Sequence, residues 1–202
     1  MLTVDTGMCK VGAARYLSRT ANGASSAPSA TAPWRTPFRR PSAPHSTDRG
    51  RQVVSMSGDG GFSMPMGDFL TLVQYGLPVK VVLFNNSSLG MVELEMSVSG
   101  LPAYGRRTRT PTSRPSRARR ARTGVRVEKP EQLTAALKDA FRHPGPARAD
   151  GVTDPAAPSI PPKTRAGTVT GFARSASRIV GDGGVGRMIR MARSDLRNAP
   201  RP

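Results

Sequence analysis

Two short polar clusters near the middle of the chain carry residue types that suit a metal ion and a phosphate. The first is Gly58-Asp59-Gly60-Gly61, and the second is Asn85-Asn86 with the two serines that follow it. Magnesium prefers hard oxygen ligands in a near-octahedral shell and keeps waters unless phosphate oxygens replace them. Asp59 offers a carboxylate, Asn86 an amide oxygen and Ser88 a backbone carbonyl. These residues predict a site in which one divalent cation holds a diphosphate.

The glycines of the first cluster favour the same chemistry. Gly60 and Gly61 have no Cβ, so the backbone can approach a phosphate closely. A helix that begins beside them directs free amides and the positive end of its dipole at the same place. A Gly-Asp-Gly turn or an Asn-Asn-Ser-Ser loop alone is a weak signal. Both together, each following a strand and separated by one crossover unit, are a much stronger one.

Two apolar segments must bring these clusters together. Gln52 to Met56 is expected to be a short strand, and residues 58–61 the turn that follows it. Val79 to Phe84 is nearly all apolar, which is typical of a strand that is covered on both faces. A right-handed crossover places the two strands parallel and adjacent. Both clusters then emerge at one edge of the sheet, where open α/β sheets bind their ligands.

The connecting segment is expected to be a helix from about Ser63. Pro65 is tolerated in its first turn, where the missing amide has no intrahelical partner. Gly76 is expected to end it as a left-handed cap. An apolar stripe at helical spacing predicts the face that packs on the sheet. Its members are Phe62, Met66, Phe69, Leu70 and Val73.

The ends of the chain contain further elements of the same kind. Leu2 and Val4 could end a strand, and the Asp5 that follows is expected to be a turn or cap residue. Pro130 is expected to start a helix after a strand at 125–127. The predicted apolar stripe of that helix consists of Leu133, Ala136, Leu137, Ala140 and Phe141.

The last third of the chain is less regular. Residues 147–153 occupy the place of a strand, although Arg148, Asp150 and Gly151 interrupt the apolar pattern. A loop at 155–162 is expected to lead into helices at about 167–180 and 185–197.

The charge, the cysteine count and the lengths of the apolar runs limit the classes of protein to which this chain can belong. The 202 residues carry a net charge of +18, which by default indicates nucleic acid or an anionic membrane surface as a partner. The single Cys9 excludes an intramolecular disulfide and a multi-cysteine zinc site, and favours a reduced, cytoplasmic setting. No secretory signal is evident, and no run approaches the roughly 18–20 apolar residues of a membrane helix.

Residues 48–96 resemble the GDG…NN signature of thiamine-diphosphate enzymes. Their amino-acid sequence is most similar to that of pyruvate oxidases of the ubiquinone-dependent pyruvate dehydrogenase type, and next most similar to that of acetolactate synthases. Residues 3–9, 125–141 and 159–163 resemble parts of the same C-terminal domain in the same order. The resemblance implies an α/β fold, a three-layer parallel-sheet domain that binds thiamine diphosphate.

The resemblance also implies a role for each residue of the site. Asp59, Asn86 and the carbonyl of Ser88 would ligate Mg²⁺. The residues expected to bind the cofactor are Gly58, Asp59, Gly60, Gly61, Asn86, Ser87, Ser88, Leu89, Gly90 and Met91.

Members of this family decarboxylate pyruvate as homotetramers and use more than one domain. The glutamate that activates the cofactor belongs to an N-terminal domain, and FAD binds a middle domain. Neither domain is recognised in this sequence, so the chain is expected to be inactive by itself. Glu93 and Glu95 are acids near the metal site, but no catalytic residue is assigned among them.

Two stretches depart from the family pattern, residues 20–47 and 106–123. Neither shows a spacing of 2 or 3.6, and the second contains eight arginines without an acidic residue. We interpret both as out-of-frame translations of a GC-rich gene, with the frame restored near Asp48 and Gly124. A one-base shift of a His-Gly-Ser-Met-Ala type sequence yields residues 31–44. Both stretches are expected to be disordered, and the second to lie in solvent.

These observations divide the chain into five parts. Residues 1–19 and 124–202 are expected to form the two ends of the diphosphate-binding domain, the latter with the C-terminal helices. Residues 48–105 form its metal- and diphosphate-binding βαβ core. Residues 20–47 and 106–123 are the basic or proline-rich insertions between these parts.

Two alternatives to cofactor binding remain open. Residues 106–123 could bind nucleic acid through their arginines, but without interleaved aromatics no specific nucleic acid is expected. The C-terminal helix could contact the inner face of a membrane as a peripheral helix, with its apolar residues on one side and four arginines at the surface. A solvated helix on the domain is the preferred interpretation. The apolar residues concerned are Met188, Ile189, Met191 and Leu196.

Overall fold

An all-parallel β-sheet forms the centre of the computed structural model, which describes residues 2–17, 25–26, 52–101, 104–108 and 124–155 and scattered residues between 173 and 193. The six strands are ordered β2-β1-β3-β4-β6-β5. The predicted α/β class with a parallel sheet is confirmed. The strands are β1 (Leu2–Val4), β2 (Ser25–Ser26), β3 (Val53–Gly58), β4 (Val79–Asn85), β5 (Gly124–Val127) and β6 (Ala147–Val152).

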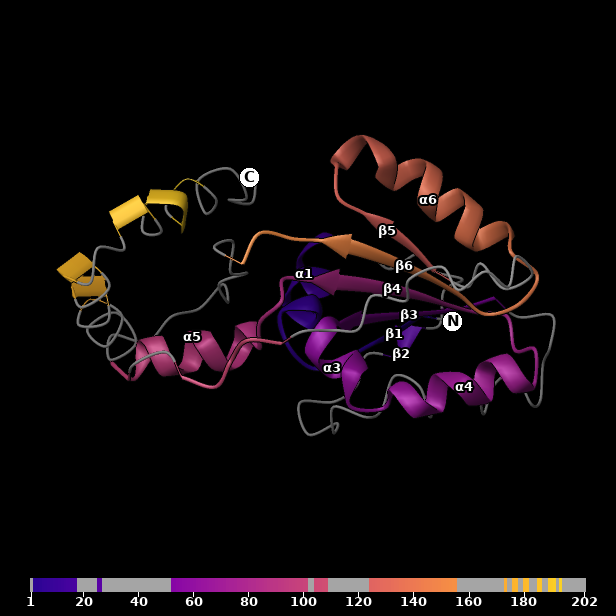
Figure 1. The fold of residues 1–202 in the computed structure, drawn as a ribbon, viewed down its shortest axis with the longest axis horizontal. Coiled ribbons are helices and arrows are strands. Elements are labelled where there is room, and N and C mark those ends of the chain that lie inside the picture. The colour runs from indigo at the N-terminus through magenta and orange to yellow at the C-terminus, as the bar shows by residue number, and fades with distance from the viewer. Residues whose placement is uncertain are drawn as a thin grey trace.

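Helices lie on both sides of this sheet. Figure 1 shows α4 and α6 on opposite sides of the strands, and α5 beyond the strands' carboxyl ends. The sheet therefore forms the middle of three layers, as predicted. The helices are α1 (Met8–Tyr16), α3 (Asp59–Ser63), α4 (Met66–Gln74), α5 (Gly90–Val98) and α6 (Pro130–Arg142).

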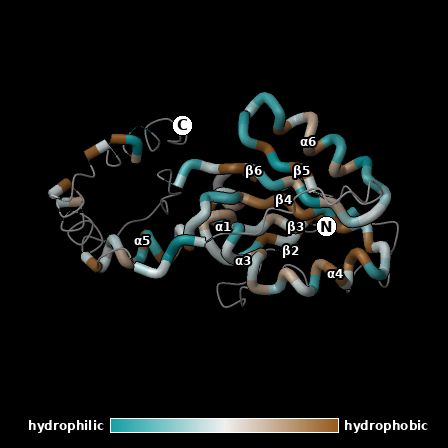
Figure 2. The backbone as a smooth tube through the Cα atoms, viewed as in Figure 1, coloured by the Kyte–Doolittle hydropathy of each residue, from teal (hydrophilic) through white to brown (hydrophobic). Residues whose placement is uncertain are grey.

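Each face of the sheet has its own apolar cluster, because successive side chains of a strand point to opposite faces. One cluster joins Val53 of β3 and alternate residues of β4 to Phe62 and Leu72 of the helices. The other joins Val4 of β1 to Cys9 and Ala13 of α1. Figure 2 shows apolar colouring along β4 and also along α4. Burial on both faces explains why β4 is almost continuously apolar.

The order of the strands determines where a ligand site can lie in this fold. From β1 the chain reaches β2 on one side, and later β3 on the other side. Such a reversal leaves a crevice at the carboxyl ends of the two neighbouring strands, where open α/β sheets bind ligands. β3 and β4 pair in parallel, with Gly58 opposite Phe84. The predicted convergence of the two polar clusters at one edge is confirmed.

The junction between β3 and the following helix differs from the prediction. β3 continues to Gly58, and α3 begins at Asp59 rather than near Ser63. Gly58 is extended, with φ −76° and ψ 160°, and serves directly as the N-cap. The expected separate turn at 58–61 is therefore wrong, because one extended residue suffices to pass from strand to helix.

The predicted apolar stripe is wrong for α4. Leu72 is buried there, whereas Leu70 is 69% exposed. Turn residues Met64 and Pro65 separate α3 from α4, so spacing counted from Phe62 does not continue into the second helix. Phe62 and Phe69 pack on the sheet as expected, whereas the stripe members Met66 and Val73 are exposed.

The end of α4 agrees with the prediction. Gly76 has φ +60°, a left-handed conformation that glycine adopts without strain. The amide of Leu77 then donates to the carbonyl of Leu72 at 2.9 Å. The capped turn leads directly into β4.

The second half of the sheet is more regular than its sequence indicates. β6 lies between β4 and β5 and pairs with both, despite its charged residues. Arg148 is accommodated over the ring of Phe62, at 5.5 Å from the ring centre. α6 begins at Pro130 as predicted, and of its stripe Ala136 is buried while Leu133 and Phe141 are exposed.

The stretches 20–47 and 106–123, both predicted to be disordered, each contain residues that the structure describes. Ser25 and Ser26 form β2, which pairs in parallel with β1. A strand edge offers backbone groups to any extended chain, so this pairing needs no apolar pattern. The other predictions for 20–47 lie outside the described residues, as do those for 109–123 and 156–162 and most of those for the two C-terminal helices. Across the described part of the chain, no helix is long and apolar enough to cross a membrane.

Candidate functional site

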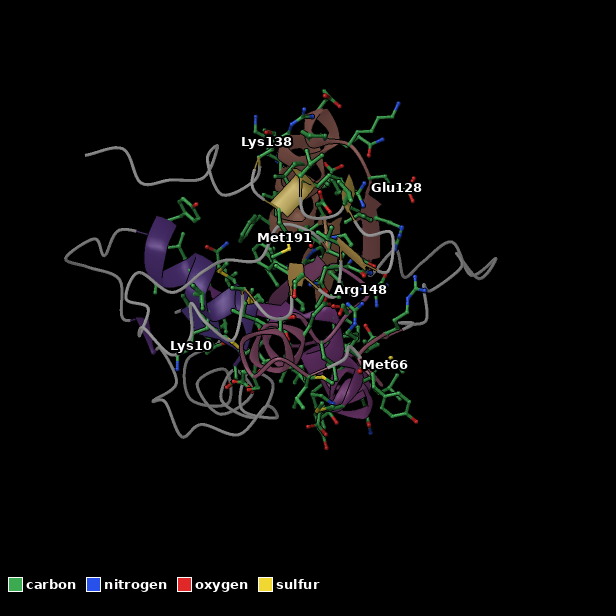
Figure 3. The ribbon with its side chains drawn as sticks, turned by 90° about the vertical axis from the view of Figure 1, so that its left-hand side faces the viewer. Lys10, Met66, Glu128, Lys138, Arg148 and Met191 are labelled. Atoms are coloured by element: carbon green, nitrogen blue, oxygen red, sulfur yellow. The ribbon has the colours of Figure 1, made fainter. Side chains whose placement is uncertain are left out.

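A cavity of about 400 Å³ opens at the carboxyl edge of the sheet. Its walls come from residues 6–9 after β1, the 58–61 segment, the Asn86 loop and α5. Figure 3 looks onto this edge, with Met191 labelled near the centre of the view. Met191 also lines the cavity. Segments that are distant in sequence thus enclose one space at the strand reversal.

The cavity brings together most of the residues expected to bind the cofactor. Ser87 is the exception: it is exposed and does not line the cavity. Its hydroxyl instead donates to the side-chain oxygen of Asn85 at 3.3 Å. The predicted residues that do line the cavity are Gly58, Asp59, Gly60, Gly61, Asn86, Ser88, Leu89, Gly90 and Met91.

Asp59 and Asn86, the two predicted side-chain ligands, are neighbours in the structure. Asp59 is 1% exposed at the start of α3. Burial raises the pKa of this carboxyl, while the hydroxyl of Thr108 and the backbone amides of Asp59, Gly60 and Asn86 oppose the rise. The Asp59 carboxylate therefore reaches across from β3 to the loop that follows β4. This contact is what the parallel strand pairing predicts.

The loop after β4 is shaped by its own side chains. The Asn86 side-chain oxygen accepts a hydrogen bond from the Ser88 amide at 3.0 Å. A carbonyl oxygen has two lone pairs, so this bond leaves one for another partner. A Cβ on Gly90 would lie 2.9 Å from the Asn86 side-chain nitrogen. Glycine at that position allows α5 to begin against the amide.

Protein contacts explain two glycines of the first cluster, Gly60 and Gly61, whereas a Cβ on Gly58 would meet nothing within 4 Å. A Cβ on Gly60 would lie 2.4 Å from a methyl carbon of Leu89. A Cβ on Gly61 would lie 1.9 Å from Oδ2 of Asp5. Gly61 is therefore needed for close packing against Asp5, in addition to any approach of a phosphate.

Asp5 does not line the cavity but packs directly behind Gly61, a supporting position that the sequence did not predict. It is 1% exposed and accepts hydrogen bonds from the Ser57 hydroxyl at 2.7 Å and the Thr6 amide at 2.8 Å. Burial raises the pKa of its carboxyl to about 6, although these two hydrogen bonds oppose the rise. Its position at the end of a strand was a signal, but the neighbour of that strand could not be read from the sequence.

Cys9 lies beside Asp5 and is also buried. Its thiol is 3.5 Å from the Asp5 carbonyl oxygen. Burial, together with the Asp5 charge, raises the pKa of the thiol to about 12. The thiol therefore stays protonated and unreactive near neutral pH.

Residues 104–108 form a strap over the Asn86 loop. The Leu89 amide donates to the Arg106 carbonyl at 2.8 Å, and the Thr108 amide donates to the Ser87 carbonyl at 3.1 Å. Ser88 and Arg107 form an antiparallel bridge. The expectation that the arginine-rich stretch lies in solvent is therefore wrong for Arg106 and Thr108, which are partly buried, whereas Arg107 is exposed. Backbone pairing holds these residues because it does not depend on an apolar pattern.

Side chains of the strap also contact the site. The Thr108 hydroxyl donates to Oδ2 of Asp59 at 2.5 Å. Arg106 forms an ion pair with Glu93, which also accepts a hydrogen bond from the Ser88 hydroxyl at 2.8 Å. Glu93 is thus buried in a structural network, whereas Glu95 is exposed. In the described part of the chain, no three His, Cys, Asp or Glu side chains gather around a point that could hold a metal.

Comparison with known families agrees with this geometry. Residues 5–150 match the thiamine pyrophosphate enzymes in their C-terminal TPP binding domain, a match that covers more than half of the chain. The chain belongs to this family. YdaP of Bacillus subtilis (strain 168), provisionally described as a thiamine pyrophosphate-containing protein, is 32% identical over 174 residues, or 86% of the chain.

Acetolactate synthases are also similar to this TPP-binding domain. The large subunit of Porphyra purpurea is 33% identical over 105 residues, which cover 48% of the chain and 17% of that protein. The enzyme of Arthrospira platensis is 49% identical over 49 residues, which cover 24% of the chain and 8% of that protein. The chain spans only 30% of the length of YdaP.

Proposed function

We propose that this chain binds thiamine diphosphate through a magnesium ion held by Asp59, Asn86 and the carbonyl of Ser88. The observation that carries the proposal is the convergence of Asp59, Asn86 and Ser88 on one cavity at the carboxyl ends of β3 and β4. Asp59 begins the helix after β3 and Asn86 follows β4, so a carboxylate and an amide side chain from two neighbouring strands line the same cavity.

The residues present fit such an ion. Magnesium in phosphate sites is commonly held by one or two carboxylates, with phosphate oxygens and waters completing the shell. Asp59 supplies one carboxylate, and Asn86 and Ser88 supply neutral oxygens. One negative charge from the protein leaves a divalent ion net positive, which favours an anionic cofactor. Gly60 and Gly90 keep the backbone close on both sides of these ligands.

The reaction that we propose is decarboxylation of a 2-oxo acid, with pyruvate as the substrate. Bound thiamine diphosphate supplies a nucleophilic ylid and stabilises the carbanion formed from such acids. Residues of this chain would hold the diphosphate end and shield it from water. Two continuations are possible: transfer to a second 2-oxo acid, in line with the similarity to acetolactate synthases, or oxidation of the product, which only the resemblance of residues 48–96 to pyruvate oxidases suggests.

Further parts of the proposal concern what joins this domain. We propose that the active enzyme is a homo-oligomer in which another domain supplies the activating glutamate, and that an FAD domain accompanies it if the reaction is oxidative. The nucleic-acid alternative concerns residues 106–123. Of these, 109–123 lie outside the described residues, and Arg106 is paired with Glu93.

Calorimetric titration of the full chain with thiamine diphosphate and Mg²⁺ tests the proposal. Asp59→Ala removes the single charged ligand and is expected to weaken binding by more than about 100-fold, beyond the usual effect of outer-shell changes. Chelation of Mg²⁺ should weaken the wild-type chain similarly. Asp139→Ala, at an acidic residue of α6, serves as the matched control and should bind normally. Equal binding by the wild type and Asp59→Ala would reject the assigned site.

A further inference from the structure

Asp150 lies in β6, where the sequence indicates an interruption of the strand. Its side chain is nevertheless buried, with 2% exposure. The strand register pairs it with Leu83 of β4 and with Arg126 of β5. Paired residues on adjacent strands point to the same face of a sheet. Asp150 therefore presents a buried carboxylate on the face that it shares with the last residues of β4.

A chain of hydrogen bonds leads from Asp150 to the loop after β4. Oδ1 of Asp150 accepts a hydrogen bond from Nδ2 of Asn85 at 3.0 Å. Oδ1 of Asn85 in turn accepts hydrogen bonds from the Ser87 amide at 3.2 Å and the Ser87 hydroxyl at 3.3 Å. A carboxylate accepts hydrogen bonds and does not donate them. Asp150 therefore holds the NH₂ end of the Asn85 amide and leaves its oxygen directed at Ser87.

Ser87 needs such support because of its backbone. With φ of 55°, it is the one non-glycine residue of the described chain in the left-handed region. A side chain makes this conformation unfavourable. The two hydrogen bonds to Asn85 retain it, and the resulting turn directs the chain from Asn86 to Ser88. Both neighbours of Ser87 are proposed metal ligands.

We propose that Asp150 is a positioning residue for the metal and diphosphate loop, and that it acts through Asn85. This inference rests on the proposed function, because it assigns the loop to a magnesium-bound diphosphate. The second carboxylate oxygen of Asp150 lies 3.7 Å from a guanidinium nitrogen of Arg126. The amide of Thr153, just beyond β6, donates to the Asn85 carbonyl at 2.9 Å. β6 therefore anchors both the side chain and the backbone of Asn85.

Two measurements on the full chain test this role. One is the affinity for thiamine diphosphate with Mg²⁺ by calorimetry, and the other is hydrogen exchange of the Ser87 amide by NMR. Asp150→Leu removes the acceptor and is expected to weaken binding by about 10–100-fold, as for other outer-shell partners. Exchange of the Ser87 amide should become faster in the same variant, even without the cofactor.

An isosteric series separates positioning from charge balance. Asp150→Asn removes the charge beside Arg126 but can still accept from Asn85, so it should retain most of the affinity. Asn85→Asp places two acceptors face to face, and should accelerate exchange at Ser87. Combining Asn85→Asp with Asp150→Asn restores one donor and one acceptor, and should restore slow exchange. This series also serves if Asp150→Leu does not fold.

Lys80 provides a control at the other end of β4. It is 3% exposed, and its ammonium group donates to the carbonyl of Gly145 at 2.7 Å. Lys80→Met should lower the melting temperature while leaving both the affinity and the Ser87 exchange unchanged.

Three results would overturn the inference: wild-type affinity in Asp150→Leu, equal losses in Asp150→Leu and Asp150→Asn, or no restored protection in the exchanged pair. Absence of binding by the wild-type chain would instead reject the proposed function. The exchange of the Ser87 amide would still decide whether Asp150 holds the loop through Asn85.

Discussion

Gly61→Ala is the substitution for which the structure predicts the largest local conflict. The added Cβ would lie 1.9 Å from Oδ2 of Asp5, 3.0 Å from its Cγ and 3.4 Å from the Ser57 hydroxyl oxygen. Contacts below 3.0 Å are essentially never seen for real Cβ atoms. The Asp5 carboxylate must therefore withdraw by about 1 Å or the helix must move, since interiors this densely packed have few voids to take up the change.

The magnitude follows from two effects. Overpacking of a buried site costs about 1–3 kcal/mol. Withdrawal of the carboxylate also disturbs the hydrogen bonds from the Ser57 hydroxyl and the Thr6 amide, and a bond to a charged group contributes about 1.5–3 kcal/mol. We therefore expect Gly61→Ala to lower the free energy of unfolding by about 3 kcal/mol, a large fraction of the roughly 5–15 kcal/mol of a typical domain.

Urea unfolding followed by circular dichroism measures this loss, and a double-mutant cycle assigns it. In an Asp5→Ala background the carboxylate is absent, so Gly61→Ala should cost at least about 1 kcal/mol less than in the wild type. Gly67→Ala is the matched control, since a Cβ there meets nothing within 4 Å and alanine favours a helix by up to about 1 kcal/mol. Additive losses in the cycle, or a neutral Gly61→Ala, would refute the proposed packing.

Three other outcomes follow from buried groups near the site and in the core. Because folding raises the pKa of Asp5 from 3.8 to about 6, the folded state binds the proton more tightly, and the free energy of unfolding should fall as pH rises from about 4 to about 7; Asp5→Asn should flatten that slope in urea titrations. Leu72→Ala should destabilise by about 2–5 kcal/mol because Leu72 is 1% exposed, whereas Leu70→Ala should change urea unfolding by less than about 0.5 kcal/mol. Thr108→Val removes the hydroxyl that donates to Asp59, a hydrogen bond that would compete with a metal for this carboxylate and contributes about 1 kcal/mol. Mg²⁺-dependent cofactor binding, measured by calorimetry, should therefore become roughly fivefold tighter. Unchanged affinity would show that the Thr108 hydroxyl does not compete with the metal.

Much of the fold could be predicted from local patterns. The apolar run of β4, the glycine cap at Gly76 and the proline at the start of α6 each report on a single element. Together with the right-handed crossover rule they place Asp59 and Asn86 at one edge of a parallel sheet. The predicted convergence of these two residues at one edge needs no information beyond the chain's own sequence.

Errors arose where a local pattern crossed a break or depended on distant partners. The predicted apolar stripe from Phe62 to Leu70 assumed one continuous helix. A turn separates α3 from α4, so residues at helical spacing across that turn do not share a face. Arg148 and Asp150 interrupt an apolar strand in sequence, but in the sheet they find Phe62 and Asn85 as partners. Polar residues are accommodated in a core when neighbours satisfy their hydrogen bonds and charges.

The amino-acid sequence specifies the family of this protein and the residues of the proposed metal and diphosphate site, because strand ends and glycine clusters depend on neighbours along the chain. Tertiary structure alone decides how that site is supported. Asp5 against Gly61, Thr108 on Asp59 and Asp150 on Asn85 join residues that lie 49 or more positions apart. Such contacts arise from strand order and register, which no local periodicity encodes.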